Sequence, residues 1–233
     1  MSNTAATTAV VATSNNAANT AASASTATAT ATAPTAAAPA AASPSCWPYI
    51  LPLPPNDTDT RVVHIPPLSF SLVNPGIFRS ACPSGRNYAF LATLELRSVV
   101  YLCGTYPKAE LEHFTAQDIA VHCFAIEGSR EPFVSIDSEE LARAILCVVD
   151  TRKQPVLVHC TKGKHRTGVL VGVLRRLAGH SLSSAFAEYT NFIGESTASR
   201  DLDRLAIETF DIRGFKTRLN DQVPQEFRAD WIV

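Results

Sequence analysis

The order of hydrophobic and polar positions divides this chain into two unlike parts. From about residue 61 onward, short apolar runs alternate with segments in which apolar side chains recur every three or four positions. The runs are typical of buried strands, and the longer spacing is typical of helices with one face on a core. Strands are expected at residues 70–73, 77–80, 98–103, 119–126 and 155–158, and helices at residues 87–96, 109–117, 138–150, 167–178, 181–192 and 201–213.

This alternation of strands and helices predicts an α/β fold with a mostly parallel central sheet flanked by helices. A turn at Asn74-Pro75-Gly76 is expected to join the first two strands. In such sheets, ligands bind outside the carboxyl ends of the central strands. The residues that follow the apolar run at 155–158 are therefore the first place to search for a site.

The N-terminal part of the chain has a different character. Residues 1–45 are almost wholly Ala, Thr, Ser and Asn, and no charged residue precedes Asp57. Such a segment has no large side chains to bury, so ordering it would cost more free energy than it returns. Residues 46–55 are rich in proline and indicate an extended linker. We expect a disordered tail and linker at 1–56, a folded domain at 57–215 and a C-terminal tail at 216–233.

The charge balance limits the kinds of partner. The formal net charge is −1 and 18% of the residues are charged, which argues against a nucleic-acid binder. No apolar run approaches the roughly 18 residues that a membrane span needs. No cysteine and histidine cluster has zinc spacing. The sequence therefore predicts no nucleic-acid partner, no membrane span, no metal and no cofactor, and it carries no indication of oligomeric state.

Candidate chemistry is concentrated in the ten residues from His159 to Gly168, between an apolar strand and an apolar helix. A loop that leads into a helix N-terminus points backbone N–H groups at one spot, and the helix dipole adds positive charge there. Such a loop binds a phosphate-sized anion, and the same field favours the thiolate of Cys160. Arg166 can bind two phosphate oxygens at once. A thiolate beneath a bound phosphoryl group is the arrangement that covalent phosphoryl transfer requires.

The succession His-Cys, five residues, Arg, Thr, Gly resembles the signature of the cysteine-dependent protein tyrosine phosphatase superfamily. The segment 163–168 is similar to one subgroup, the plant-and-fungi atypical dual-specificity phosphatases, several of which act on inositol pyrophosphates. Three further segments agree with that subgroup: residues 74–80, residues 127–134, and Phe186, Glu188 and Tyr189. The resemblance runs from about Pro66 to Asp211 and implies a tyrosine-phosphatase-like fold, with the phosphatase domain at 57–215.

Within this pattern, Cys160 is the expected nucleophile and Arg166 the phosphate clamp. Thr167 is expected to donate its hydroxyl to the sulfur and so ease departure of the thiolate; a helix cap is the alternative role. The resemblance implies that His159 orders the loop and is no general base. Gly163 lets the backbone approach the anion.

A second group of residues is expected to bind the rest of a polyanionic substrate. In the loop itself these are Thr161, Lys162, Gly163, Lys164 and His165. Arg130 lies on the loop that precedes the catalytic strand, and Arg200 matches an arginine of the family's late helix. Simple solvated lysines are the alternative for Lys162 and Lys164.

The general acid departs from the family pattern. Tyrosine phosphatases carry an aspartate on the loop before the catalytic strand, whereas residues 127–132 contain none, which leaves Glu131 and Glu127 as candidates. A phosphate ester leaves as an alkoxide or phenoxide, and a phenol has a pKa of about 10. A phosphoanhydride leaves as phosphate, whose relevant pKa is about 6 to 7. A site without an aspartate acid therefore suits a diphosphate better than phosphotyrosine.

These observations favour a phosphohydrolase that works through a phosphocysteine intermediate and removes the terminal phosphate of diphosphoinositol polyphosphates. Its substrate would be a polyanionic small molecule. The first alternative is a protein tyrosine or dual-specificity phosphatase acting on phosphoproteins, and the second is a non-catalytic phospho-binding scaffold. A reactive thiol suits a reducing compartment, so we expect a cytoplasmic location, with the nucleus as the alternative. Cys82 and Cys103 are candidate redox partners of Cys160.

Overall fold

A computed structural model describes residues 63–129, 135–194 and 201–233 of this chain. Its elements follow the alternation that the sequence predicts. The strands are β1 Ser71–Asn74, β2 Ile77–Ala81, β3 Ser98–Tyr101, β4 Ala120–Cys123 and β5 Val156–Cys160. The helices are α1 Tyr88–Ala92, α2 Lys108–Ala116, α3 Ser138–Val149, α4 His165–Leu177, α5 Leu182–Ile193, α6 Asp201–Thr209 and α7 Ile212–Gln222.

The five strands form one sheet in the order β1-β2-β5-β3-β4. β1 and β2 are an antiparallel hairpin, and the other neighbours are parallel. The predicted α/β fold with a mostly parallel sheet is therefore confirmed. The central strand is β5, and Ala81 of β2 pairs with its last residue, Cys160. The carboxyl ends of β2, β5 and β3 thus meet at the edge where the sequence places its candidate chemistry.

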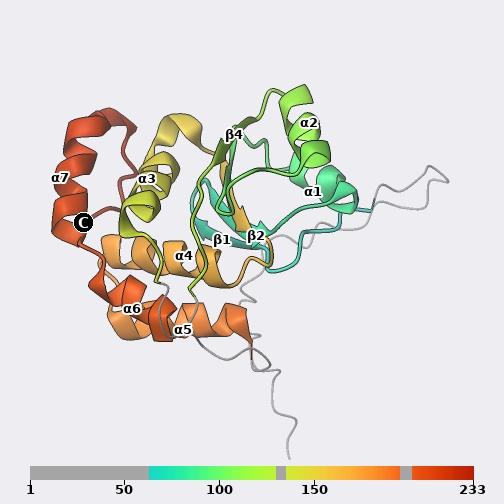
Figure 1. Ribbon diagram of the computed structural model, residues 1–233. Helices are drawn as coiled ribbons and strands as arrows, with labels where there is room; N and C mark the ends of the chain where they lie inside the picture. The colour runs from blue at the N-terminus through green and yellow to red at the C-terminus, as the bar shows by residue number, and fades with distance from the viewer. Residues whose placement is uncertain (1–62, 130–134, 195–200) are drawn as a thin grey trace, which may run out of the picture. The chain divides into compact units, whose positions relative to one another are not determined.

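Helices cover both faces of this sheet (Figure 1). Because side chains alternate along a strand, Val156 and Val158 of β5 face a core shared with α3 and α4, while Leu157 faces a second core under α1 and α2. α5 and α6 pack on the far side of α4. Most of α4 is consequently buried, including Thr167 and Gly168 near its start.

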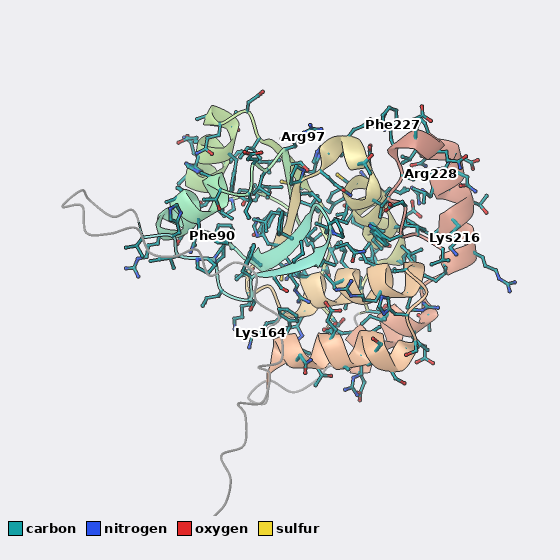
Figure 2. All side chains as sticks on the ribbon, turned by 180° about the vertical axis from the view of Figure 1, so that it is seen from behind. Phe90, Arg97, Lys164, Lys216, Phe227 and Arg228 are labelled. Atoms are coloured by element: carbon teal, nitrogen blue, oxygen red, sulfur yellow. The ribbon has the colours of Figure 1, made fainter. Side chains whose placement is uncertain are left out.

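The C-terminal region differs from the expectation. The single helix expected at 201–213 is two helices, because the Asp211 carboxylate accepts hydrogen bonds from Arg213 N and Gly214 N and starts α7. Residues 216–233 are not a loose tail. Leu219 and Val223 are buried in the core, and Asp150 forms a β-bridge with Arg228. Phe227 and Arg228 lie between α3 and α7 (Figure 2).

The remaining expectations concern the N-terminal tail and a membrane span. The disordered tail and linker expected at residues 1–56 lie outside the described residues. Within the described ranges, no helix combines the length and the apolar character that a membrane crossing requires.

Candidate active site

The candidate phosphate loop is the short connection between β5 and α4. β5 ends at Cys160 and α4 begins at His165, so four residues make the whole turn. Gly163 has a φ of +66°, in the region that side chains rarely adopt. Cys160 is buried, and it precedes the N-terminus of a thirteen-residue helix. The loop therefore has the strand–turn–helix geometry that places backbone N–H groups and a helix dipole around an anion.

Arg79 of β2 binds the backbone of this loop. No role was assigned to this residue from the sequence. Its guanidinium is fully buried, and Nη2 donates a hydrogen bond to Gly163 O at 2.9 Å. The guanidinium carbon lies 3.5 Å from the centre of the Phe192 ring, and Nη1 is 3.9 Å from a Glu188 carboxylate oxygen. Burial lowers the pKa of Arg79 to about 10, which still leaves it charged at neutral pH. Arg79 thus fixes the loop backbone where it approaches β2.

His159 points into the core under α1 and α2, away from the phosphate loop. It is fully buried, and its Nε2 is 2.7 Å from the hydroxyl of Tyr106. Burial lowers the pKa of His159 to about 4 and raises that of Tyr106, so both groups are neutral and share one hydrogen bond. This agrees with a structural role for His159 next to the nucleophile.

Two adjoining pockets open at the loop. The first has a volume of about 320 Å³ and contains Cys160. The second has a volume of about 530 Å³ and contains Glu127, and both include Gly128 and Arg166. The first is lined by Gly128, Cys160, Thr161, Lys162, Lys164, His165 and Arg166, and the second by Cys103, Ala125, Ile126, Glu127, Gly128, Ser129 and Arg166.

The cations expected to meet extra phosphates have different surroundings. Lys162 is exposed at the pocket. Lys164 lies beside the end of α5 (Figure 2), and its Nζ donates to Ile193 O at 2.8 Å. His165 is only partly exposed, and its Nδ1 is 3.0 Å from an Asp203 carboxylate oxygen. Lys162 is thus the most exposed of these three side chains, while Lys164 and His165 are held by neighbouring helices.

Thr167 occupies a position that agrees with its expected role. Its hydroxyl is buried and has no hydrogen-bond partner among the residues that the structure describes. The alternative role as helix cap does not hold, because α4 begins at His165 and its N-cap is Lys164. A hydroxyl left unpaired in the first turn of α4 is available to a sulfur or oxyanion in the loop.

The acid candidates are only partly covered by the structure. Glu127 is exposed and lines the larger pocket with Arg166. Glu131, Arg130 and Arg200 lie outside the described residues, so their roles stay predictions.

Cys82 and Cys103, the candidate redox partners, both follow strands that neighbour β5. Burial raises the pKa of Cys82 to about 11.

Asp203 of α6 is the other residue that sequence reasoning missed. Its side chain is fully buried and accepts hydrogen bonds from Ser129, Tyr189 and His165. One feature of the sequence could have indicated this buried role. Asp203 is a carboxylate on the apolar face of its helix, four positions before the buried Ile207. Arg79 gave a similar signal as a charged residue inside a short apolar strand.

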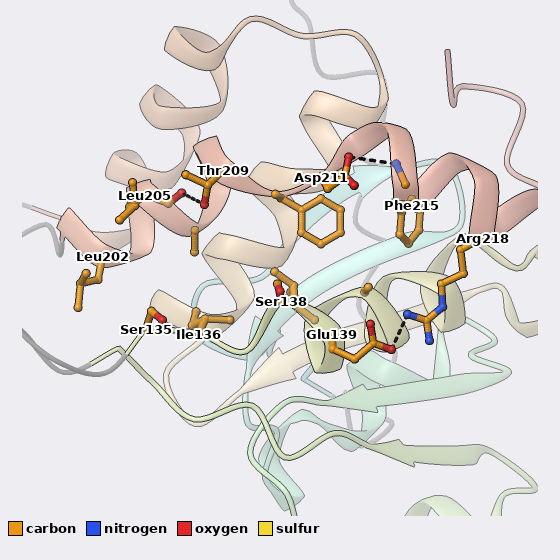
Figure 3. Close-up of a pocket in the computed structure, with 15 residues that line it drawn as sticks. Ser135, Ile136, Ser138, Glu139, Leu202, Leu205, Thr209, Asp211, Phe215 and Arg218 are labelled. Atoms are coloured by element: carbon orange, nitrogen blue, oxygen red, sulfur yellow. Dashed lines mark hydrogen bonds and ion pairs between the residues drawn. The ribbon is translucent and has the colours of Figure 1, made fainter.

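A separate pocket of about 480 Å³ lies between the start of α3, α6 and the start of α7 (Figure 3). Apolar side chains such as Leu205 and Phe215 line it, and the Arg218–Glu139 ion pair, at 2.5 Å, closes one end. It contains no residue of the phosphate loop.

A thiol and a guanidinium on one anion-binding loop, at the carboxyl end of a central parallel strand, define the class of cysteine-dependent phosphatases. The tyrosine phosphatase family matches residues 64–226. The chain belongs to this family and is a phosphatase, as its signature indicated.

Two plant relatives and one solved structure refine this placement. Inositol diphosphatase DSP2 of Oryza sativa subsp. japonica is 45% identical over 154 residues, which cover 66% of this chain and 74% of the relative. Inositol diphosphatase DSP4 of Arabidopsis thaliana is 42% identical over 153 residues, covering 65% and 76%. The core catalytic domain of the PP-IP phosphatase SIW14 from S. cerevisiae, solved with citrate, has a TM-score of 0.63 and 35% identity, covering 68% of this chain and 95% of that domain. The predicted likeness to the plant-and-fungi group is confirmed.

Proposed function

We propose that this chain removes the terminal phosphate of diphosphoinositol polyphosphates through a phosphocysteine intermediate. The observation that carries the proposal is the composition of the pocket that contains Cys160. Lys162, Lys164, His165 and Arg166 line it together with the nucleophile, on a loop already polarised by a helix N-terminus. A single phosphate needs one guanidinium and the loop amides, so the further cations suit a substrate with several phosphates.

In the first step, the Cys160 sulfur attacks the terminal phosphorus and an S–P bond forms. The bond from phosphorus to the bridging oxygen breaks, and the inositol polyphosphate leaves with that oxygen on its remaining phosphate. Arg166 and the loop amides stabilise the equatorial oxygens. In the second step, water attacks the same phosphorus, inorganic phosphate leaves, and the thiolate is regenerated. The Thr167 hydroxyl, buried and unpaired among the described residues, can donate to the departing sulfur.

The surroundings of the leaving group support a diphosphate. Among the described residues, the pocket that contains Cys160 has no aspartate or glutamate in its lining. A diphosphate expels a phosphate of low basicity, which leaves without a strong proton donor. The plant relatives and the yeast domain are named for activity on inositol diphosphates, which agrees with this chemistry.

The test compares phosphate release from diphosphoinositol pentakisphosphate and from a phosphotyrosine peptide, with Cys160→Ser as the control. We expect kcat/KM to be higher for the inositol substrate and turnover of both to vanish in the variant. A clear preference for the peptide rejects the proposed substrate while leaving the cysteine chemistry intact.

A protein tyrosine or dual-specificity phosphatase is the second candidate. It is favoured by Glu127, which shares the larger pocket with Arg166 and can serve as an acid there. In that case kcat/KM for the peptide follows a bell-shaped pH profile, and the limb set by the acid disappears in Glu127→Gln or Glu131→Gln. The non-catalytic scaffold is excluded if rapid acid quenching during turnover traps a phosphate on Cys160.

We further propose a cytoplasmic location, with the nucleus as the alternative, because a thiolate nucleophile persists in a reducing compartment. Fractionation of cells that express the full chain tests this proposal. Recovery in a secreted or membrane fraction contradicts it.

A further inference from the structure

Asp203 is a buried carboxylate that receives donors from three separate segments. Its Oδ2 accepts from the Tyr189 hydroxyl at 2.5 Å and from His165 Nδ1 at 3.0 Å, and its Oδ1 accepts from the Ser129 hydroxyl. Burial by itself disfavours the ionised carboxyl, but these hydrogen bonds and the charge of His165 outweigh it and lower the pKa of Asp203. The group is therefore an acceptor in all three contacts.

This fixes the state of one nitrogen of His165. A carboxylate cannot donate, so Nδ1 of His165 must carry a proton to make the bond. Nδ1 points at a side chain that is fully buried, while His165 is one of the residues that line the pocket containing Cys160 and Arg166. The edge of the ring on the pocket side is consequently the one that carries Nε2. A phosphate oxygen there would meet Nε2, while the Asp203 carboxylate holds Nδ1 from the other side.

The same carboxylate also binds the segment Gly128–Ser129, which forms the wall of the site opposite the phosphate loop. Ser129 is buried and lines the larger pocket, and its neighbour Gly128 lines both pockets. Through Ser129 and His165, Asp203 therefore fixes the spacing between that wall and the phosphate loop. A fully buried charge is a costly way to join packed elements, and such groups are concentrated where a site needs a set geometry.

We propose that Asp203 is a positioning residue for the polyanionic substrate. It holds His165 with Nε2 toward the pocket, where this nitrogen contacts a phosphate other than the one attacked by Cys160. The proposal rests on the proposed function, because a substrate with a single phosphate has no second group for His165 to meet.

The experiment measures kcat and KM for diphosphoinositol pentakisphosphate and for p-nitrophenyl phosphate, at one fixed pH. Asp203→Asn keeps the shape of the side chain but loses its charge and one acceptor. We expect KM for the inositol substrate to rise about tenfold, as for loss of one charge-assisted contact. KM for p-nitrophenyl phosphate should change by less than about twofold, and kcat for both substrates should change less than the inositol KM. Glu208→Gln, on the exposed face of the same helix, is the matched control and should resemble the unaltered protein.

A double-mutant cycle then separates positioning from general support of the fold. If Asp203 acts through His165, adding Asp203→Asn to His165→Ala should change the inositol KM by less than about twofold. Equal effects of Asp203→Asn in the two backgrounds, or equal KM changes for the two substrates, overturn the proposal.

Histidine side-chain nitrogen NMR of the unaltered protein gives a readout that survives any folding defect of the variants. We expect the His165 signals to show a proton on Nδ1, and a ring protonated on Nε2 alone overturns the proposal. Failure of the proposed function looks different. In that case p-nitrophenyl phosphate is hydrolysed, the inositol substrate is not, and the NMR result still decides whether Asp203 orients His165.

Discussion

At the scale of single residues, the site depends on how closely the phosphate loop approaches β2. A Cβ placed on Gly163 would lie 2.5 Å from backbone atoms of Ser80 and Ala81. These atoms belong to a strand paired with β5, so they cannot move without shifting the sheet. The hydrogen bond from Arg79 to Gly163 O depends on the same close approach. Gly163 is thus required both for its φ and for the space that it leaves.

Gly163→Ala should therefore harm both stability and catalysis. We expect the free energy of unfolding to fall by about 2–4 kcal/mol, from backbone strain and overpacking together. A displaced loop should also lower kcat/KM by roughly 100-fold. Gly194→Ala is the matched control, because Gly194 has a φ of +75° but a Cβ there meets none of the described residues within 4 Å. Urea unfolding and steady-state kinetics of both variants check this, and similar losses in the two would show that φ strain alone is responsible.

His159 should make stability depend on pH in a defined direction. Burial lowers its pKa to about 4 from an ordinary value of 6.5, so the unfolded chain takes up the proton first as the pH falls. Stability is therefore lost as the pH falls through this window and is retained above it. Between about pH 7 and pH 5, the contribution is on the order of 2 kcal/mol. His159→Gln keeps a hydrogen-bonding group beside Tyr106 but does not titrate, so its unfolding free energy should fall less over this range by that amount. Equal pH dependence in the two proteins would contradict the assignment.

At the scale of elements, α7 shows which interaction holds a peripheral helix in place. Phe215 and Leu219 are buried in the core, on one face of the helix, while Arg218 pairs with Glu139 of α3 at 2.5 Å. The Glu139 side chain is 65% exposed, so solvent screens this pair. Apolar burial should therefore outweigh the ion pair.

Two substitutions in α7 test whether apolar burial stabilises the helix more than the ion pair does. Phe215→Ala should lower the free energy of unfolding by roughly 3–5 kcal/mol, since it leaves a cavity in the core. Arg218→Ala should lower it by no more than about 1 kcal/mol. Urea denaturation of each variant gives the comparison. A larger loss for Arg218→Ala would mean that the ion pair, which closes one end of the pocket in Figure 3, holds α7 in place.

At the scale of the whole molecule, the periodic parts of the sequence predicted the fold well, for a physical reason. β5 is apolar because both faces of the sheet are covered, and α3 carries a regular apolar face behind an Asp137 cap. Periodicity failed at α7, where Phe215 and Leu219 are buried, Ile212 packs against the core from the first position, and most of the other residues are polar. A single stripe at intervals of four residues is a weak signal against a polar background.

The candidate site was predictable to the extent that it is continuous in sequence. The loop from His159 to Gly168 carries its pattern within ten residues, and the structure brings Cys160, His165 and Arg166 to one pocket. Arg79 and Asp203 could not be assigned in this way. Each acts from a distant segment, 84 positions from Gly163 in one case and 38 positions from His165 in the other. Their roles follow from tertiary contacts that no local spacing encodes.

The two ends of the chain should respond to removal in opposite ways. Residues 1–56 have no large apolar side chains before the proline-rich segment and no charge, so removing them should change the free energy of unfolding by less than about 0.5 kcal/mol. Ending the chain after Phe215 removes most of α7 and the buried Leu219, Val223 and Ala229. Loss of two large core side chains alone costs about 4–8 kcal/mol, which is comparable to the stability of a typical domain. We therefore expect the first truncation to keep cooperative unfolding and phosphatase activity, and the second to lose both. Circular dichroism melts and p-nitrophenyl phosphate turnover of the two shortened chains measure this, and an active, folded chain that ends at Phe215 would show that the C-terminal segment is dispensable after all.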